Sequence, residues 1–150
     1  MRLNFYRFDV EWHIDRPADA VFSALTDLDA YPTWWPDYSE VRRVEDRTVE
    51  FILRAPMAYK LVVTNRFLVN SPVDGHFRLA LGGDIVGWID FVVTDKGSGH
   101  TEVRIAQECT ATKALLRILA PIAKPAFRYN HALVMRHGLE SLNRLLPEAI

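Results

Sequence analysis

A run of short turn signals between residues 37 and 110 constrains the fold of this sequence more than any other feature. The segments between these turns predict strands at 39–46, 48–55, 59–70, 75–82, 84–94 and 100–110. The turns themselves are Glu45-Asp46-Arg47, Ala55-Pro56-Met57, Ser71-Pro72-Val73-Asp74-Gly75, Gly82-Gly83-Asp84 and Lys96-Gly97-Ser98-Gly99. Because parallel strands need crossovers of about a dozen residues or more, connections this short predict an antiparallel sheet.

The residues before this run predict one more strand and two short helices. Residues 4–14 alternate between apolar and polar side chains, as a strand with one buried face does. From Pro17 the apolar residues follow helical spacing, and Thr26-Asp27 separates a first short helix from a second one, which YPTWWP closes. The apolar side of the strand consists of Tyr6, Phe8, Val10, Trp12 and Ile14.

The last forty or so residues predict one long amphipathic helix. At about 100° per residue, its apolar residues fall within about 60° of Asn130. This stripe contains Leu116, Leu119, Ala123, Ala126, Phe127, Val134, His137, Ser141 and Leu145. Pro121 and Pro125 predict a kink or a broken start before about residue 126.

This order of elements predicts an α+β fold, in which a curved antiparallel sheet of about seven strands wraps around the C-terminal helix. Small residues on both surfaces leave room for a cavity between them. They are Ala123, Ala126 and Ser141 on the helix and Gly82, Gly83 and Gly87 on the sheet. Alternatively, these small residues allow the helix and the sheet to pack closely, without a cavity.

Composition sets further bounds on the class of protein. The chain has 150 residues and a net charge of −1, which favours one domain over 1–150 and gives no overall field for binding nucleic acid. Cys109 is the single cysteine, so we expect no internal disulfide and a cytoplasmic location. The charged N-terminus does not resemble a signal peptide, and no apolar run reaches the roughly 20 residues that membrane insertion needs.

Three segments carry a resemblance to a known family. They are IDRPADAVFSALTDLDAYPTWWPDYSEV at 14–41, Gly87-Trp88 with Gly99–Val103, and LAPIAKPAFRYNHALVMRHGLESLNRLL at 119–146. The chain resembles the START-like, or SRPBCC, helix-grip superfamily, which includes birch-pollen-allergen-like proteins. Within it the chain is most similar to the polyketide cyclase/dehydratase and lipid-transport branch. The resemblance implies a helix-grip fold with a ligand cavity, but no single function, because this fold hosts carriers, sensors, cyclases and oxygenase domains.

The stretch YPTWWPDYSE at 31–40 places Trp34 and Trp35 in a connection stiffened by prolines. The resemblance implies that this connection lies beside the mouth of the cavity. We therefore predict that one tryptophan anchors the segment and the other lines the entrance. The alternative is that both close the open end of the core.

Polar residues on the predicted inner faces are the candidates for chemistry. Asn130 and His137 lie on the helix stripe, where they either satisfy buried backbone groups or face a ligand, with His137 as an acid or base and Asn130 orienting a carbonyl. Asn65 and Gln107 are in phase with apolar strand neighbours, and for them the same two roles stay open: a bond to buried backbone or water, or contact with a ligand. The apolar part of the predicted ligand site contains Phe67, Leu79, Trp88, Ile89, Phe127 and Val134.

Arg66 and Arg104 are predicted on the outer face of the sheet. A one-residue slip in strand register would turn them inward and indicate an acidic ligand.

Other kinds of site find little support in the sequence. No glycine-rich phosphate loop, nucleophile elbow or zinc-type cysteine pair is present, and Cys109 is expected to be a buried thiol. His131 and His137, the closest histidine pair, lie about 120° apart around a helix and cannot easily share an iron ion. We therefore predict no metal and no cofactor.

Three functions remain open. The first is a module, monomeric or homodimeric, that binds a small hydrophobic or aromatic molecule such as a lipid or a polyketide-like compound. The second is a cyclase, aromatase or dehydratase that uses the same cavity. The third is an interaction or assembly factor with a vestigial cavity, which an exposed apolar patch around Trp34, Trp35 and Met57 would favour.

Overall fold

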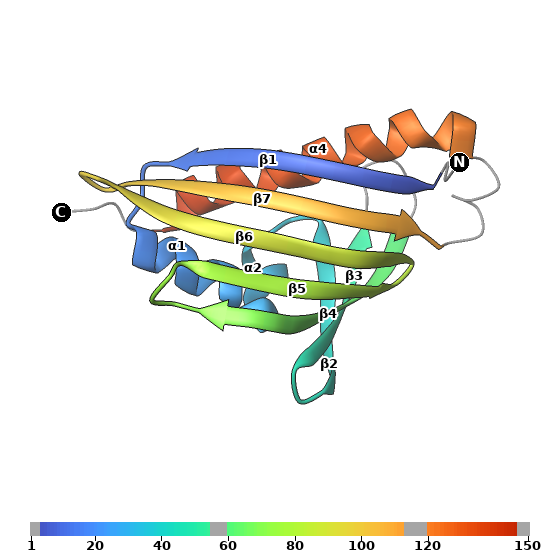
Figure 1. The fold of residues 1–150 in the computed structure, drawn as a ribbon, viewed down its shortest axis with the longest axis horizontal. Coiled ribbons are helices and arrows are strands. Elements are labelled where there is room, and N and C mark those ends of the chain that lie inside the picture. Colours follow the sequence, from blue (N-terminus) through green and yellow to red (C-terminus); the bar gives the residue numbers. More distant parts are fainter. Residues whose placement is uncertain (1–3, 55–59, 113–119, 147–150) are drawn as a thin grey trace.

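The computed structural model describes residues 4–54, 60–112 and 120–146, with side chains of the last segment described from Lys124. Seven antiparallel strands form one sheet in the order β1-β7-β6-β5-β4-β3-β2 (Figure 1). The strands are β1 (Phe5–Ile14), β2 (Tyr38–Glu45), β3 (Thr48–Arg54), β4 (Lys60–Ser71), β5 (His76–Gly83), β6 (Ile85–Gly97) and β7 (His100–Ala111). The predicted α+β fold class and strand pattern are confirmed.

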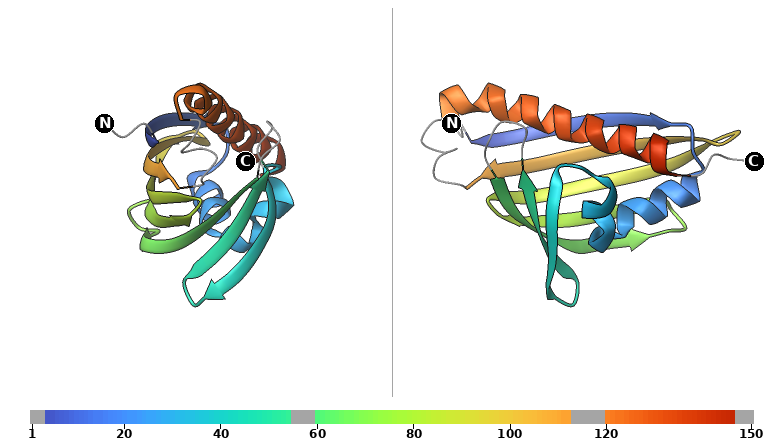
Figure 2. Two further views of the ribbon diagram at one scale, coloured as in Figure 1. Left: turned by 90° about the vertical axis from the view of Figure 1, so that its right-hand side faces the viewer. Right: turned by 180° about the vertical axis from the view of Figure 1, so that it is seen from behind.

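The helices also follow the predicted order. Between β1 and β2 lie α1 (Ala18–Thr26), the short 3-10 helix η1 (Leu28–Ala30) and α2 (Tyr31–Trp34), and the chain ends in α4 (Ala120–Leu145). Seen end-on, the sheet curves around α4, and α1 and α2 close the lower part of the same concave side (Figure 2). No helix among the described residues is long and apolar enough to cross a membrane.

Irregular pairing bends the sheet at several places. The register shifts between Tyr38 and Glu40 in β2, between Phe67 and Val69 in β4, and between Asp95 and Gly97 in β6. Such bulges bend a strand and increase its twist. At Gly87 the strands approach so closely that a Cβ atom would lie 1.9 Å from the backbone oxygen of Glu108, which accounts for a glycine there.

The buried face of α4 is rotated relative to the predicted stripe. Phe127, Asn130, Val134 and Ser141 are buried as predicted, whereas Leu145 is 54% exposed. The rotation arises where the helix meets the tryptophans: Met135, Gly138 and Leu142 are also buried, and a Cβ on Gly138 would lie 2.6 Å from the Trp35 ring.

Several sequence predictions fall on residues outside this description. These are the stripe positions Leu116 and Leu119, the side chain of Ala123, and the turn Ala55-Pro56-Met57 with its neighbouring strand ends.

The predicted broken start of the helix differs from the structure, in which α4 is one helix from Ala120 and includes Pro125.

Candidate functional site

A cavity of about 90 Å³ lies between α4 and the concave face of the sheet. Most of the described side chains around it are apolar and come from β3 to β6 and from α4. The lining consists of Tyr31, Tyr38, Leu53, Leu61, Val63, Asn65, Leu79, Leu81, Ile85, Ile89, Phe91, Gln107, Phe127, Asn130, His131, Val134 and Met135. Seven of the twelve predicted ligand residues are among them: Asn65, Leu79, Ile89, Gln107, Phe127, Asn130 and Val134.

Strand register explains why the two predicted polar strand residues face inward. Asn65 on β4 pairs with Leu81, and Gln107 on β7 pairs with Ile89, so each is in phase with a buried apolar neighbour. Both amides are buried, with 7% and 4% exposure. Because three strand steps of about 4.8 Å separate β7 from β4, the two amides lie on different walls of the cavity.

Sequence reasoning missed the role of His131, which lines the cavity beside Gln107. Its Nε2 lies 2.9 Å from Oε1 of Gln107, and its ring stacks on Phe8 with 3.6 Å between centroids. His131 stands about 100° from Asn130 and so falls outside the predicted stripe. It still faces protein because the curved sheet also covers that flank of α4, where Phe8 of edge strand β1 meets its ring.

Burial favours the uncharged form of the ionisable groups in and beside the cavity. Loss of solvation lowers the pKa of His131 to about 4, and nearby Arg128 lowers it further. Burial likewise raises the pKa of the Cys109 thiol to about 11 and the pKa values of Tyr31 and Tyr38 above their usual range. Cys109 is therefore a protonated thiol, as expected from the sequence.

The two tryptophans lie outside the cavity lining, while tyrosines of the same segment belong to it. Trp35 is 1% exposed, and its indole N–H donates to the Val134 carbonyl at 2.8 Å. Trp34 is half-buried and stacks on Trp35 with centroids 5.2 Å apart. Trp35 thus holds the segment against α4, and Tyr31 and Tyr38 form its cavity wall instead of a tryptophan.

His137 and Asn130 do not converge on one point of the cavity. Asn130 lines it, whereas Nδ1 of His137 lies 2.9 Å from Oδ2 of the buried Asp37. The packing of Gly138 against Trp35 turns His137 toward the connection between α2 and β2. The predicted pairing of His137 with Asn130 at a ligand therefore differs from the structure.

Trp88 and Phe67 are the other predicted ligand residues that lie outside the lining. Trp88 alternates with the buried Ile89 and therefore points to the outer face, where the Arg78 guanidinium lies 4.6 Å from its ring centroid. Phe67 precedes the bulge in β4 and packs toward Phe77, with 6.3 Å between centroids.

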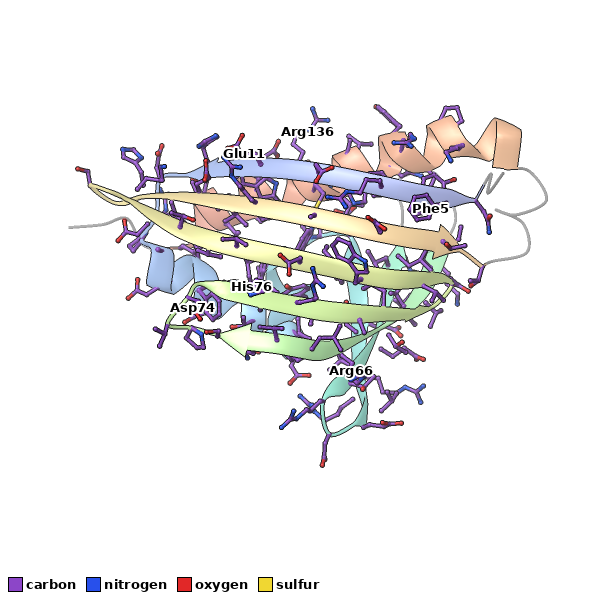
Figure 3. The ribbon with its side chains drawn as sticks, in the orientation of Figure 1. Phe5, Glu11, Arg66, Asp74, His76 and Arg136 are labelled. Atoms are coloured by element: carbon purple, nitrogen blue, oxygen red, sulfur yellow. The ribbon has the colours of Figure 1, made fainter. Side chains whose placement is uncertain are left out.

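Arg66 and Arg104 are exposed on the outer face, as predicted, and Figure 3 shows Arg66 there. The alternative register, which would have turned these arginines toward the ligand, is wrong.

Glu11, His13 and Glu102 form a separate polar cluster on the outer face, with side-chain ligand atoms within 4.8 Å of one another. Arg104 lies between the two carboxylates, 3.3 Å from Glu102 and 3.6 Å from Glu11. Its guanidinium thus already supplies positive charge to the cluster, which is remote from the cavity.

Comparisons with known proteins agree with this architecture. The aromatase/cyclase Zhui from Streptomyces sp. R1128 has a TM-score of 0.79 at 12% identity over 93% of this chain and 92% of its own. A START superfamily protein from Mycobacterium smegmatis has a TM-score of 0.72 at 14% identity, over 91% and 94%. The di-domain ARO/CYC BexL matches 99% of this chain with 52% of its own, at 12% identity and a TM-score of 0.75.

At such identities these likenesses establish the fold alone, and no curated protein matches the chain. The sequence model of one family, in contrast, matches residues 6–147, nearly the whole chain. The chain therefore belongs to the polyketide cyclase/dehydrase and lipid-transport family.

Proposed function

We propose that the protein binds a small hydrophobic or aromatic molecule in the cavity between the sheet and α4. The observation that carries this proposal is the character of the lining, in which apolar side chains surround a few buried amides and one neutral histidine. Ligand sites in proteins share this composition, because apolar burial supplies affinity and a few polar groups set orientation.

The size of the cavity limits how such a molecule binds. A cavity of about 150 Å³ accommodates benzene, whereas this one has about 90 Å³. A ligand with an aromatic ring therefore enters only if lining side chains move. Met135 is suited to this because its unbranched side chain adopts several shapes at low cost.

A cyclase or dehydratase reaction in the same cavity is the second possibility, and it would need an acid or base there. Of the histidines in the described part of the chain, His131 is the one in the lining. A general base works best with a pKa near the working pH, so a pKa of about 4 makes His131 a weak base at neutrality. This observation favours binding over catalysis.

Native mass spectrometry of protein purified from its own host, followed by extraction and identification of the bound molecule, tests the proposal. We expect an apolar molecule to co-purify unchanged. A cyclised or dehydrated product would instead support the enzyme.

A pair of variants on α4 locates the binding. Val134→Phe fills the cavity and should abolish co-purification, whereas Ala132→Phe places the same side chain on the exposed side of the helix and should leave co-purification unchanged. Equal retention by both variants, each shown by circular dichroism to be folded, would place the ligand elsewhere.

A further inference from the structure

The chemistry of the lining restricts which small molecules this cavity can hold. No lysine, arginine, aspartate or glutamate occurs among its described residues. Arg66 and Arg104, which would have met an acidic ligand, are on the opposite face of the sheet. An ionised ligand group would therefore be buried without a counter-charge, which costs far more than burial of a neutral polar group.

The hydrogen bonds of Gln107 define what the cavity offers to a neutral ligand. Its Oε1 accepts a hydrogen bond from Nε2 of His131 at 2.9 Å, since an amide oxygen can only accept. Its Nε2 donates to Sγ of Cys109 at 3.6 Å. The amide group is thus held in one orientation by a neighbour on each side.

An amide nitrogen carries two hydrogens, and within the described residues the contact with Cys109 is the one hydrogen bond that Nε2 of Gln107 donates. The second N–H has no acceptor among the described residues, at a cavity wall that otherwise consists of His131 and of apolar side chains such as Ile89 and Phe127. A buried donor of this kind gains free energy when a ligand oxygen accepts from it.

We infer that the ligand is electrically neutral and places a hydrogen-bond acceptor, such as a ketone or quinone oxygen, against the amide nitrogen of Gln107. The inference rests on the proposed function and names its ligand class. It excludes fatty acids and other ionised carboxylates as the preferred ligands, and it makes Gln107, held by His131, the residue that orients the molecule.

Three compounds of nearly the same shape test this inference: isopropylbenzene, acetophenone and benzoate. They share a phenyl ring with a branched three-atom substituent and differ in having no acceptor, a neutral acceptor and a negative charge. We expect isothermal titration calorimetry at pH 7 to show acetophenone binding roughly five-fold more tightly than isopropylbenzene, the worth of about one net hydrogen bond. Benzoate should not bind measurably.

A variant at position 107 assigns the acceptor contact. Gln107→Leu should remove the advantage of acetophenone and leave isopropylbenzene binding intact. Asn70→Leu makes a comparable change at an exposed position of β4, outside the cavity, and should leave the advantage in place.

Each contrary result would reject a different part of the proposal. Benzoate binding as tightly as acetophenone would overturn the neutral-ligand inference while supporting a binding function. Persistence of the acetophenone advantage in Gln107→Leu would overturn the role of Gln107. Absence of binding by all three compounds would count against the proposed binding function itself.

Discussion

At the scale of single residues, His131 shows how strongly the surroundings decide chemistry. The same helix carries His137 about 120° away, beside a buried carboxylate, while His131 is packed against Phe8 and Gln107. The two imidazoles therefore have different hydrogen-bond partners and different surroundings, although nothing in the local sequence distinguishes the two histidines. Helical spacing alone favoured His137, because the curvature of the sheet around α4 does not enter that calculation.

The lowered pKa of His131 predicts a dependence of stability on pH. Its pKa of about 4 in the folded protein lies below the ordinary value of 6.5, so between these values the unfolded chain binds the proton and the folded protein does not. As the pH falls from 6.5 to 4, His131 should lower the free energy of unfolding by at most about 3 kcal/mol. Above pH 6.5 His131 should not make the free energy of unfolding depend on pH.

The measurement compares urea unfolding of the wild type and His131→Gln, which does not titrate, between pH 4 and 7.5. As the pH falls across this window, the free energy of unfolding should decrease more for the wild type than for His131→Gln. Parallel curves would mean that burial does not suppress protonation of His131.

Gly87 is the residue at which backbone proximity most restricts the side chain. A Cβ there would lie 1.9 Å from the Glu108 backbone oxygen, so Gly87→Ala should force β6 and β7 apart and cost about 3 kcal/mol or more. Gly97→Ala is the control. Gly97 has a φ of +88° but no atom near its Cβ position, and we expect a cost of only about 1–2 kcal/mol from the left-handed conformation. Equal losses in thermal or urea unfolding would contradict the steric explanation.

At the scale of elements, the connection from α2 to β2 is fastened to α4 at two points. Trp35 donates to the Val134 carbonyl, and Asp37 accepts from His137. The sequence predicted that one tryptophan would anchor this segment. It could not indicate which one, because both have the same local composition and only the packing against Gly138 distinguishes them.

Replacement of each tryptophan by phenylalanine separates their roles. Trp35→Phe keeps an aromatic ring but removes the N–H that Val134 accepts, and should lower the free energy of unfolding by about 1–2 kcal/mol. Trp34→Phe, at a half-buried position that stacks without a described hydrogen bond, should cost less than about 0.5 kcal/mol. A larger loss for Trp34→Phe would mean that stacking, not the hydrogen bond, holds the segment.

His137→Ala should affect stability and leave ligand binding intact. It removes the partner of the buried Asp37 carboxylate, for which we expect a loss of about 1–3 kcal/mol in chemical unfolding. Because His137 does not line the cavity, the acetophenone affinity of the folded variant should remain within about two-fold of the wild type. A complete loss of binding, or of turnover in any future assay, would restore His137 as a site residue.

At the scale of the whole molecule, ligand binding and folding are linked. A molecule that binds only the folded protein at about 100 times its dissociation constant raises the free energy of unfolding by about 2.7 kcal/mol. Isopropylbenzene at that excess should therefore raise the melting temperature of the wild type. Val134→Phe, in which the cavity is filled, should show no such shift, and an equal shift in that variant would indicate binding outside the cavity.

The sequence by itself determined the fold class, the strand order along the chain and the inward orientation of Asn65, Gln107 and Asn130. These follow from local periodicity: two residues per repeat in a strand, 3.6 in a helix, and turns too short for parallel crossovers. Such rules apply within one element and need no knowledge of its neighbours.

Only the tertiary structure decided that His131 forms a hydrogen bond with Gln107 and that His137 pairs with Asp37. It also decided that Tyr31 and Tyr38, and not the two tryptophans, line the cavity. Each of these contacts joins residues far apart in the sequence, and their geometry depends on the bend of the sheet and on the rotation of α4 at Gly138. The size of the cavity is decided in the same way, since it is the space left after both layers have packed.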